Sequence, residues 1–396
     1  MRITDITVHP VQAPGRTLVP VLVHTDAGLT GVGEAGLQRR WKAVEGAVLH
    51  LKRWLVGEDP MRIEHLWQRM ARGGFYPADR LIGSALSAID IALWDIKGQS
   101  LGAPVYELLG GRCRDRVACF FQPGYLTPVV EHPRMKAVAE GDLYADDREI
   151  RQAAERMAAE GNRYFRVSPN AIDGVFDAPT AMERTLRQLR AVREAVGDAL
   201  ELMVDLHTRL SPPEAVWFCR ACEPLRVFVV EDPIRAEHPA GYRHIRAHTH
   251  VPLAAGEQWA GPWEFRTVIE EELVDYVRPD LCICGGLTAG RKIAAMAETH
   301  LVKLLPHNPL GPVCTAASLH LDLACDNAGP QEVLWPPQDI LPDVFECSFR
   351  QEDGYLTVPA TPGLGVKFNL EAAGAYPAEM TEPPHWRRGD GSYTNY

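Results

Sequence analysis

The chain has 396 residues, of which 46% are hydrophobic, so it is long enough for one barrel-sized domain with a large core and a second module. Its formal net charge of -11 provides no basic stripe, and we expect no nucleic-acid partner. No apolar run reaches transmembrane length, and Met1 to Asp5 lead directly into a strand-like alternation, so we expect neither a membrane span nor a signal peptide. Nine cysteines scattered through apolar segments are typical of reduced thiols and predict a cytoplasmic protein.

The first module is expected to cover residues 1–111 and to be α+β. Residues 2–10 and 19–26 are predicted strands, and Asp26-Ala27-Gly28 supplies turn chemistry for a hairpin into residues 29–34. Helical patterns follow near 41–56, 60–72 and 81–98. Two segments, 12–17 and 72–79, are expected to be loops rich in Gly, Pro and Arg. The second contains Tyr76 and has the composition of a substrate-capping surface, although ordinary turns have the same composition.

Three short apolar runs in the middle of the chain each end in a carboxylate. These acids are Asp205, Glu231 and Glu257, spaced 26 residues apart. A βα unit occupies about 25 residues, and repeated units bring the carboxyl ends of parallel strands to one face. Three acids on that face would repel one another without a cation between them. The spacing therefore predicts a divalent metal site.

The same period continues downstream. Asp280, His307 and Glu332 follow further strand-like segments at intervals of 23, 27 and 25 residues. A single residue of this kind would be read as a helix cap or a turn acid. Six acidic or histidine side chains at this regular spacing, each at a predicted strand end, favour an active site.

The barrel is expected to begin with a strand at 117–121. A long polar segment, residues 122–147, separates it from a helix near 148–160. Loops of that length in compact domains are often lids or binding loops, although a disordered or oligomer-contact loop fits the composition equally well. The side chains that would reach a substrate from it are Tyr125, His132, Arg134, Lys136 and Tyr144.

A helix start marks the top of the barrel. Ser211-Pro212-Pro213-Glu214 combines a capping hydroxyl, prolines in the first turn and Glu at the third position. The preceding loop, residues 205–209, therefore lies at the strand ends, and His207 points into the same space as the acids. Cys219 and Cys222 form a CxxC on the helix that follows, where core packing is favoured over a zinc or redox role. Residues 345–368 are expected to be strands and turns.

The chain resembles the enolase superfamily, mandelate racemase subgroup, over essentially its whole length. The residues that carry the resemblance are Gly73-Gly74-Phe75-Tyr76, Ala92 to Gly98, Asp205-Leu206-His207-Thr208-Arg209, Val230-Glu231-Asp232-Pro233, Ala255-Gly256-Glu257, Arg278-Pro279-Asp280, Pro306 to Pro312 and Gln331-Glu332. Within the subgroup the chain is similar to the D-galactonate and D-mannonate type of acid-sugar dehydratase.

The resemblance implies an α/β fold in which an α+β capping domain covers a modified (β/α)7β barrel. The domains would be 1–111 (cap), 112–340 (barrel) and 341–396 (a segment returning to the cap). It also implies Mg²⁺ held by Asp205, Glu231 and Glu257, a homo-oligomer, and a small sugar acid as the substrate.

The chemistry of such a site can be argued from the residue types. Taking a proton from the carbon beside a carboxylate creates an enediolate dianion, and an oxygen-bound dication neutralises its charge. His307 is the candidate base, with Asp280 one strand away to fix its tautomer, and the resemblance implies the same pair. His207 would protonate the departing hydroxyl, and Glu332 would contact the enediolate oxygen. Arg166, Arg209 and Tyr76 are candidate substrate contacts.

One departure concerns the second barrel strand. Many relatives carry Lys-x-Lys there, whereas this chain has Arg166 and Ser168, which disfavours a two-base racemase. The second-strand sequence is nearer the mannonate type, and the segments around His307 and Glu332 are nearer the galactonate type. We therefore expect an Mg²⁺-dependent dehydration of a sugar acid to a 2-keto-3-deoxy acid, without naming the acid. The alternatives are an epimerase or cycloisomerase using the same enediolate, and a non-catalytic relative.

Overall fold

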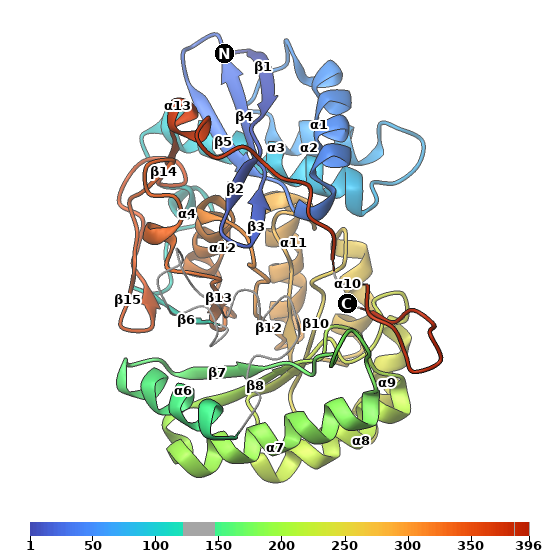
Figure 1. The fold of residues 1–396 in the computed structure, drawn as a ribbon. Coiled ribbons are helices and arrows are strands. Elements are labelled where there is room, and N and C mark those ends of the chain that lie inside the picture. Colours follow the sequence, from blue (N-terminus) through green and yellow to red (C-terminus); the bar gives the residue numbers. More distant parts are fainter. Residues whose placement is uncertain (122–146, 384, 396) are drawn as a thin grey trace. The chain divides into compact units, whose positions relative to one another are not determined.

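The computed structural model describes residues 1–121, 147–383 and 385–395, and these divide into two compact units (Figure 1). The first unit comprises Met1–Ala118, Glu257–Arg266 and Arg278–Thr381, and the second comprises Cys119–Gly256, Thr267–Val277 and Glu382–Tyr396. The chain passes from one unit to the other within strand β6 (Val117–Phe120) and again within helix α10 (Pro262–Glu270). The domain division expected from the sequence stays a prediction.

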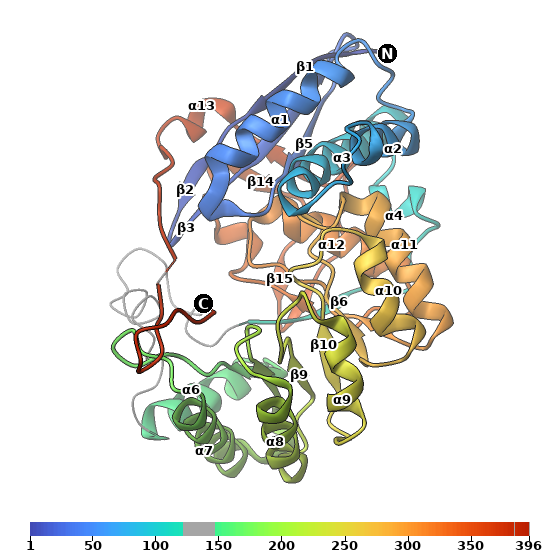
Figure 2. The same cartoon turned by 90° about the vertical axis from the view of Figure 1, so that its right-hand side faces the viewer.

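The first unit opens with a three-stranded antiparallel sheet in the order β1-β4-β5, as the sequence predicts. The strands are β1 (Ile3–Val8), β4 (Pro20–Thr25) and β5 (Thr30–Glu34). Gly28 has φ 77° in the turn between the last two, a conformation that costs glycine little. Three helices follow, α1 (Trp41–Leu55), α2 (Ile63–Arg72) and α3 (Arg80–Leu101), and Figure 2 shows α1 running alongside the sheet.

The segment 12–17 is not the loop expected from its composition. It lies in a hairpin of β2 (Val11–Ala13) and β3 (Arg16–Leu18), with Gly15 at φ 72° in the turn. Ala13 and Leu18 are buried, so the segment is stabilised by apolar packing as well as by the hydrogen bonds between its two strands. The Pro and Gly of the sequence mark only the tip of the hairpin.

Strand β5 and helix α3 lie so close together that the strand has no room for a side chain at Gly31 or Gly33. A Cβ built at Gly33 would lie 1.8 Å from the Ala88 carbonyl oxygen, and one at Gly31 would lie 2.1 Å from that of Ala92. Asp95 of the same helix accepts hydrogen bonds from the backbone of Val32 at 3.0 Å and of Leu364 at 2.8 Å. The helix thus joins the sheet to a segment near the end of the first unit.

The rest of the first unit contains further helices and short strands. Its helices are α4 (Val105–Leu108), α11 (Gly286–Thr299), α12 (Pro312–Ala324) and α13 (Leu370–Ala373). Its strands are β12 (Lys303–Leu304), β13 (Gln331–Glu332), β14 (Phe345–Cys347), β15 (Gln351–Glu352), β16 (Tyr355–Leu356) and β17 (Val366–Phe368). The strands and turns expected over 345–368 are confirmed.

The second unit is built from repeated βα units. Its parallel strands are neighbours in chain order: β7 (Tyr164–Val167), β8 (Glu201–Asp205), β9 (Val229–Glu231), β10 (Leu253–Ala255) and β11 (Tyr276–Val277). The helices are α6 (Asp147–Ala159), α7 (Ala178–Val196), α8 (Pro212–Cys222) and α9 (Tyr242–Arg246), and Figure 1 shows α7 and α8 running beside the strands. The carboxyl ends of these strands therefore share one edge.

Helix α8 begins as the sequence predicts. Ser211 and Glu214 form a capping box, with the Ser211 backbone N–H donating to the Glu214 carboxylate at 2.7 Å. Cys219 and Cys222 lie on the buried face of this helix, and burial raises the pKa of the Cys219 thiol to about 12. Both cysteines therefore act as packing groups.

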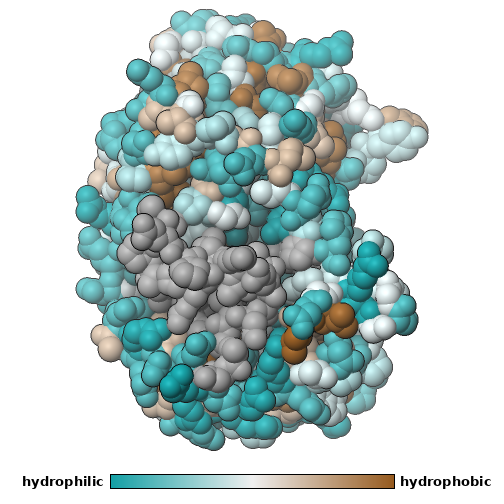
Figure 3. All heavy atoms as spheres, viewed as in Figure 1, coloured by the Kyte–Doolittle hydropathy of each residue, from teal (hydrophilic) through white to brown (hydrophobic). Residues whose placement is uncertain are grey.

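Most of the molecular face in Figure 3 is hydrophilic, and its apolar side chains occur in small separate groups. Among the described residues, no helix combines the length and the apolar character that crossing a bilayer requires.

We predict that Gly33→Ala destabilises the protein, because the new methyl group would meet the backbone of α3. The expected loss in the free energy of unfolding is about 1–3 kcal/mol or more. Urea unfolding followed by circular dichroism would measure it. Gly46→Ala is the matched control, because Gly46 is exposed on α1 with open space around it, and a helical Gly→Ala change stabilises by about 0.5–1 kcal/mol. Equal stability of the two variants would contradict the close approach.

Candidate functional site

Two carboxylates lie side by side at the strand ends of the second unit. Asp205 ends β8 and Glu231 ends β9, and the two residues are direct partners in the parallel register. Their side chains are 1% and 0% exposed. Two buried like charges on adjacent strands require a compensating positive charge.

Arg166 of β7 supplies positive charge to this pair. Its Nη1 lies 2.8 Å from Glu231 Oε1 and 3.7 Å from Asp205 Oδ2. The guanidinium group is itself buried and lies 5.5 Å from the ring centroid of Phe120. The structure thus brings Arg166 to the predicted metal ligands. Its predicted contact with substrate stays a prediction.

His207 folds back onto Asp205. Its backbone N–H donates to Asp205 Oδ1 at 3.0 Å, and its Nε2 lies 2.7 Å from Asp205 Oδ2. The backbone of this loop has positive φ at two successive residues, 46° at His207 and 58° at Thr208. For residues with a side chain such a backbone costs about 1–3 kcal/mol each and is typical of functional sites.

A second cluster lies in the first unit and contains Glu257, Asp280, His307 and Glu332. His307 Nδ1 lies 2.9 Å from Asp280 Oδ2, which is the pairing that the strand spacing predicts. On the other side of the ring, Nε2 lies 3.6 Å from Glu257 Oε2. Asp280 also accepts a backbone hydrogen bond from Cys282 at 2.8 Å, which fixes its carboxylate. The imidazole is therefore held between two acids.

Sequence reasoning assigned no role to Arg278, which proves central to this cluster. Its side chain is 0% exposed, and Nη2 lies 2.6 Å from Glu332 Oε2 and 3.9 Å from Glu257 Oε2. Asn308 adds a backbone N–H at 3.3 Å from Glu332 Oε2. The available signal was an arginine inside an apolar strand end, because a buried guanidinium group needs carboxylate partners.

The pKa of His307 reflects its neighbours. Burial lowers this pKa. The negative charges of Glu257, Asp280 and Glu332 and the hydrogen bond to Asp280 have the larger, opposite effect, and together they raise the pKa to about 9. The raised pKa favours the protonated ring in the protein without metal. A cation bound at Glu257 would remove one of these influences.

Cys282 and Cys314 lie beside the same dyad, with potential ligand atoms of Asp280 and both thiols within 4.8 Å of one another. Burial raises the pKa of Cys314 to about 12 and that of Cys282 well above its ordinary value. Neutral thiols are poor metal ligands, so these groups pack around the dyad.

The remaining predicted positions are less informative. Tyr76 is 78% exposed in the loop after α2, where its ring packs edge-on against Phe75 at 5.1 Å. The candidate contacts in the long polar segment, from Tyr125 to Tyr144, lie outside the described residues. The predicted roles of Tyr76 and of these residues stay predictions.

The carboxylates of each unit are of the kind that binds hard divalent cations. In the second unit, Asp205 and Glu231 offer carboxylate oxygens on paired strand ends. In the first unit, Glu257 Oε2 makes no hydrogen bond within the described part of the chain. Carboxylate oxygens are the ligands that Mg²⁺ and similar cations prefer.

Comparisons with known proteins agree with this chemistry. Residues 149–373 match the family described as Enolase C-terminal domain-like, and residues 3–110 match the Mandelate racemase / muconate lactonizing enzyme N-terminal domain. The D-galactonate dehydratase of Ralstonia pickettii is 37% identical over 404 residues, covering 100% of both chains. That of Variovorax paradoxus is 38% identical over 383 residues, covering 94% of this chain and 95% of the relative.

Solved structures give the same result. An enolase from Pantoea ananatis with bound D-gluconate and Mg has a TM-score of 0.90 and 30% identity, covering 100% of this chain and 99% of that one. A mandelate racemase/muconate lactonizing enzyme from Jannaschia has a TM-score of 0.86 and 29% identity, covering 97% and 100%. The fold class predicted from the sequence is confirmed: α/β, with an N-terminal cap and a C-terminal TIM barrel.

We predict that His307 titrates near pH 9 in the protein freed of divalent metal, and that Asp280→Asn lowers this pKa towards the ordinary 6.5. NMR titration of the imidazole resonances would measure both values, with His307→Gln providing the assignment. Because the folded pKa is raised, the stabilising contribution of the protonated ring is complete below pH 6.5 and is lost as the pH rises through 9. An unchanged pKa in Asp280→Asn would contradict the role given to the dyad.

Proposed function

The chain belongs to the enolase superfamily, and we propose that it is a hydro-lyase of the mandelate racemase subgroup that dehydrates a sugar acid to a 2-keto-3-deoxy acid. The curated relatives named D-galactonate dehydratase match it over their full length. The Pantoea ananatis structure contains a six-carbon sugar acid and Mg. Both support a polyhydroxy carboxylate as the substrate and Mg²⁺ as the cofactor.

Asp205, Glu231 and Glu257 are the proposed Mg²⁺ ligands. When bound, the cation supplies an electrostatic partner for the substrate carboxylate and for the negative charge that develops on it during enolisation. The paired positions of Asp205 and Glu231 support this assignment, and so does the arginine placed between them. Arg166 provides charge balance in the protein without metal and remains available to the substrate carboxylate.

His307 is the proposed base. In its neutral form it removes the proton from the carbon beside the carboxylate through Nε2, because Nδ1 is held by Asp280 at 2.9 Å. Asp280 orients the ring and stabilises the imidazolium that results. Glu332 and Arg278, in contact at 2.6 Å, are proposed to hold the enediolate oxygen through the guanidinium N–H groups.

His207 is the proposed acid, and its position is the observation that favours dehydration. Loss of the neighbouring hydroxyl requires a proton donor as well as a base, since hydroxide is a poor leaving group. The strained loop after β8 returns the His207 imidazole to Asp205, a proposed metal ligand. An epimerase or cycloisomerase would use the enediolate without a donor to a leaving hydroxyl.

Self-association, a cytoplasmic location and a place in carbohydrate catabolism stay predictions.

We predict that a library of sugar acids, with D-galactonate and D-gluconate among them, contains at least one that the protein converts to a 2-keto-3-deoxy acid in the presence of Mg²⁺. Chemical detection of that product would measure the reaction. Removal of the metal with EDTA should abolish it, because the enediolate dianion then lacks its countercharge, and added Mg²⁺ should restore it. A library without product would contradict dehydration, and deuterium exchange or an epimerised acid would then support the alternative reactions.

We predict that His207→Asn stops water loss while exchange of the substrate α-proton with solvent deuterium continues. Asparagine keeps a polar group in the loop but lacks an acidic proton, so enolisation by His307 survives and elimination does not. Loss of the base in His307→Asn should stop both reactions, which makes it the matched comparison. Mass spectrometry of recovered substrate measures exchange. The assignment of His207 as acid would be wrong if exchange disappeared with water loss.

A further inference from the structure

The loop that carries His207 is held in an unfavourable backbone by its surroundings. Besides positive φ at His207 and Thr208, its backbone is tied to the neighbouring strand end by Leu206 N–H to the Glu231 carbonyl at 3.0 Å and by Thr208 N–H to the Asp232 carbonyl at 2.6 Å. Such a conformation persists only where neighbouring groups fix it. The strand end secures the backbone, and the His207 side chain requires its own support.

A segment near the end of the chain, residues 385–395, lies in the same compact unit and is pinned close to this loop. The Phe176 N–H donates to the Arg387 carbonyl at 2.7 Å, and the Arg387 N–H donates to the Gly174 carbonyl at 2.9 Å. The segment then turns back on itself, since the Thr394 N–H donates to the Trp386 carbonyl at 3.2 Å. We refer to residues 385–395 as the tail hairpin.

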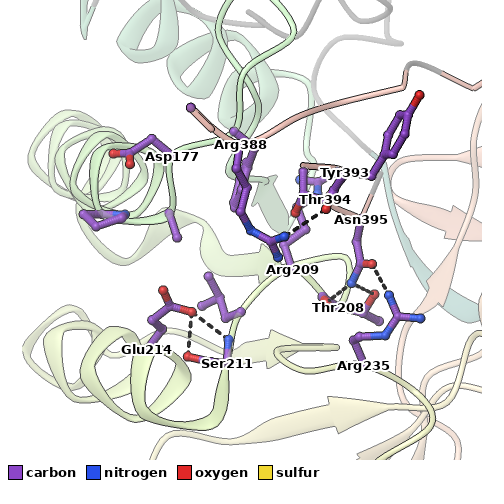
Figure 4. A pocket seen from close by; sticks show the side chains of 15 residues that line it. Asp177, Thr208, Arg209, Ser211, Glu214, Arg235, Arg388, Tyr393, Thr394 and Asn395 are labelled. Atoms are coloured by element: carbon purple, nitrogen blue, oxygen red, sulfur yellow. Dashed lines mark hydrogen bonds between the residues drawn. The ribbon is translucent and has the colours of Figure 1, made fainter. Parts of the chain in front are cut away.

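The tail hairpin also reaches the loop directly. Asn395 donates from Nδ2 to the carbonyl and the hydroxyl of Thr208, the latter at 3.2 Å, and accepts from Arg235 Nη1 (Figure 4). One of the two residues with positive φ is therefore bonded to the tail.

The side chain of Arg209 lies between the tail hairpin and His207. Its Cζ is 4.5 Å from the ring centroid of Trp386 and 5.9 Å from that of Phe176, and these two rings are parallel within 3° at 6.2 Å. Trp386 is 5% exposed and Arg209 is 7% exposed, so the guanidinium group is largely removed from water. Guanidinium groups are attracted to aromatic faces, most strongly to that of tryptophan.

From this position Arg209 contacts the imidazole. Nη2 lies 3.0 Å from His207 Nδ1, and Nη1 donates to the Pro169 carbonyl. The opposite edge of the ring, at Nε2, lies 2.7 Å from Asp205. One contact on each edge fixes both the plane of the ring and the nitrogen that it turns towards Asp205.

We propose that Trp386 is a positioning residue for His207, acting through the guanidinium group of Arg209. The proposal rests on the proposed function only in the role of His207 as the proton donor. Without the indole face, Arg209 can leave Nδ1 for water, and the imidazole then samples orientations in which Nε2 no longer keeps its position beside Asp205 Oδ2. Enolisation is assigned to the pair of His307 and Asp280, which belongs to the first unit, whereas Trp386 and His207 belong to the second. Loss of the indole should therefore affect dehydration and not α-proton exchange.

The experiment compares Trp386→Ala with Trp386→Phe in the full-length protein with Mg²⁺. In Trp386→Ala, kcat for dehydration should fall about tenfold or more, because small misplacements of catalytic groups have effects of this size. KM and the rate of α-proton exchange should stay near the wild-type values. Trp386→Phe keeps an aromatic face and should recover most of the activity. Tyr393→Ala is a control from the same tail hairpin, because Tyr393 is exposed and stacks on Arg387 rather than Arg209.

A parallel fall of exchange and dehydration in Trp386→Ala would overturn the proposal, since it would indicate a general loss of structure. Unchanged dehydration would overturn it as well. A library in which the wild type shows neither reaction would instead contradict the proposed function, and for that case a readout without substrate is needed. NMR of the imidazole, assigned with His207→Asn, should then show displaced His207 resonances in Trp386→Ala and wild-type resonances in Trp386→Phe. Resonances that stay in place in both variants would overturn the positioning role.

Discussion

Negative charge buried at the ends of strands is the constraint on which the rest of this structure depends. Two unit charges about 4 Å apart interact by roughly 4 kcal/mol at the effective dielectric of a protein near its surface, so neighbouring carboxylates need cations or protons. In the second unit Arg166 contacts both Asp205 and Glu231. In the first unit Arg278 contacts Glu332 and Glu257, and the nearby acids raise the pKa of His307. Each cluster is therefore balanced by positively charged side chains of its own unit.

Other buried acids have a different task. Glu34, Asp90 and Asp95 each accept hydrogen bonds from backbone N–H groups that lie far away in the sequence, such as those of Gly311, Thr288 and Leu364. Burial raises the pKa of Glu34 and of Asp90 to about 7 and that of Asp95 to about 6, against the lowering effect of these bonds. They join segments of the first unit. The acids at the strand ends differ because side chains of arginine or histidine contact them in addition to backbone N–H groups.

The sequence predicted those features that depend on local order or on a period. The spacing of Asp205 and Glu231 identified strand ends that the structure pairs directly, and Ser211 with Glu214 predicted the start of α8. The contact between His307 and Asp280 followed from the same period. These signals are strong because a βα unit has a nearly constant length and because a capping box lies within four residues.

Features that depend on contacts between distant residues were missed. Arg278 lies 54 positions before Glu332, and no local sequence pattern predicts the contact between the two side chains. The contacts of Arg166 with Asp205 and Glu231 were not predicted, because these partners lie on the following strands and only the parallel register brings them together. The hairpin around Gly15 was missed because burial of its neighbours, rather than its composition, decides that a ladder forms.

The tail hairpin has a consequence for how the protein is made. Thr208 and Asn395, which are hydrogen-bonded, are separated by 187 positions in the chain. Ribosomes add roughly 5–20 residues per second, so about 10–40 s pass between synthesis of the two partners. During that interval the strands of the second unit can form, while the loop carrying His207 still lacks Trp386 and Asn395. A nascent chain can therefore form the parallel strands of the second unit, which are complete at Val277, well before this loop acquires its final conformation.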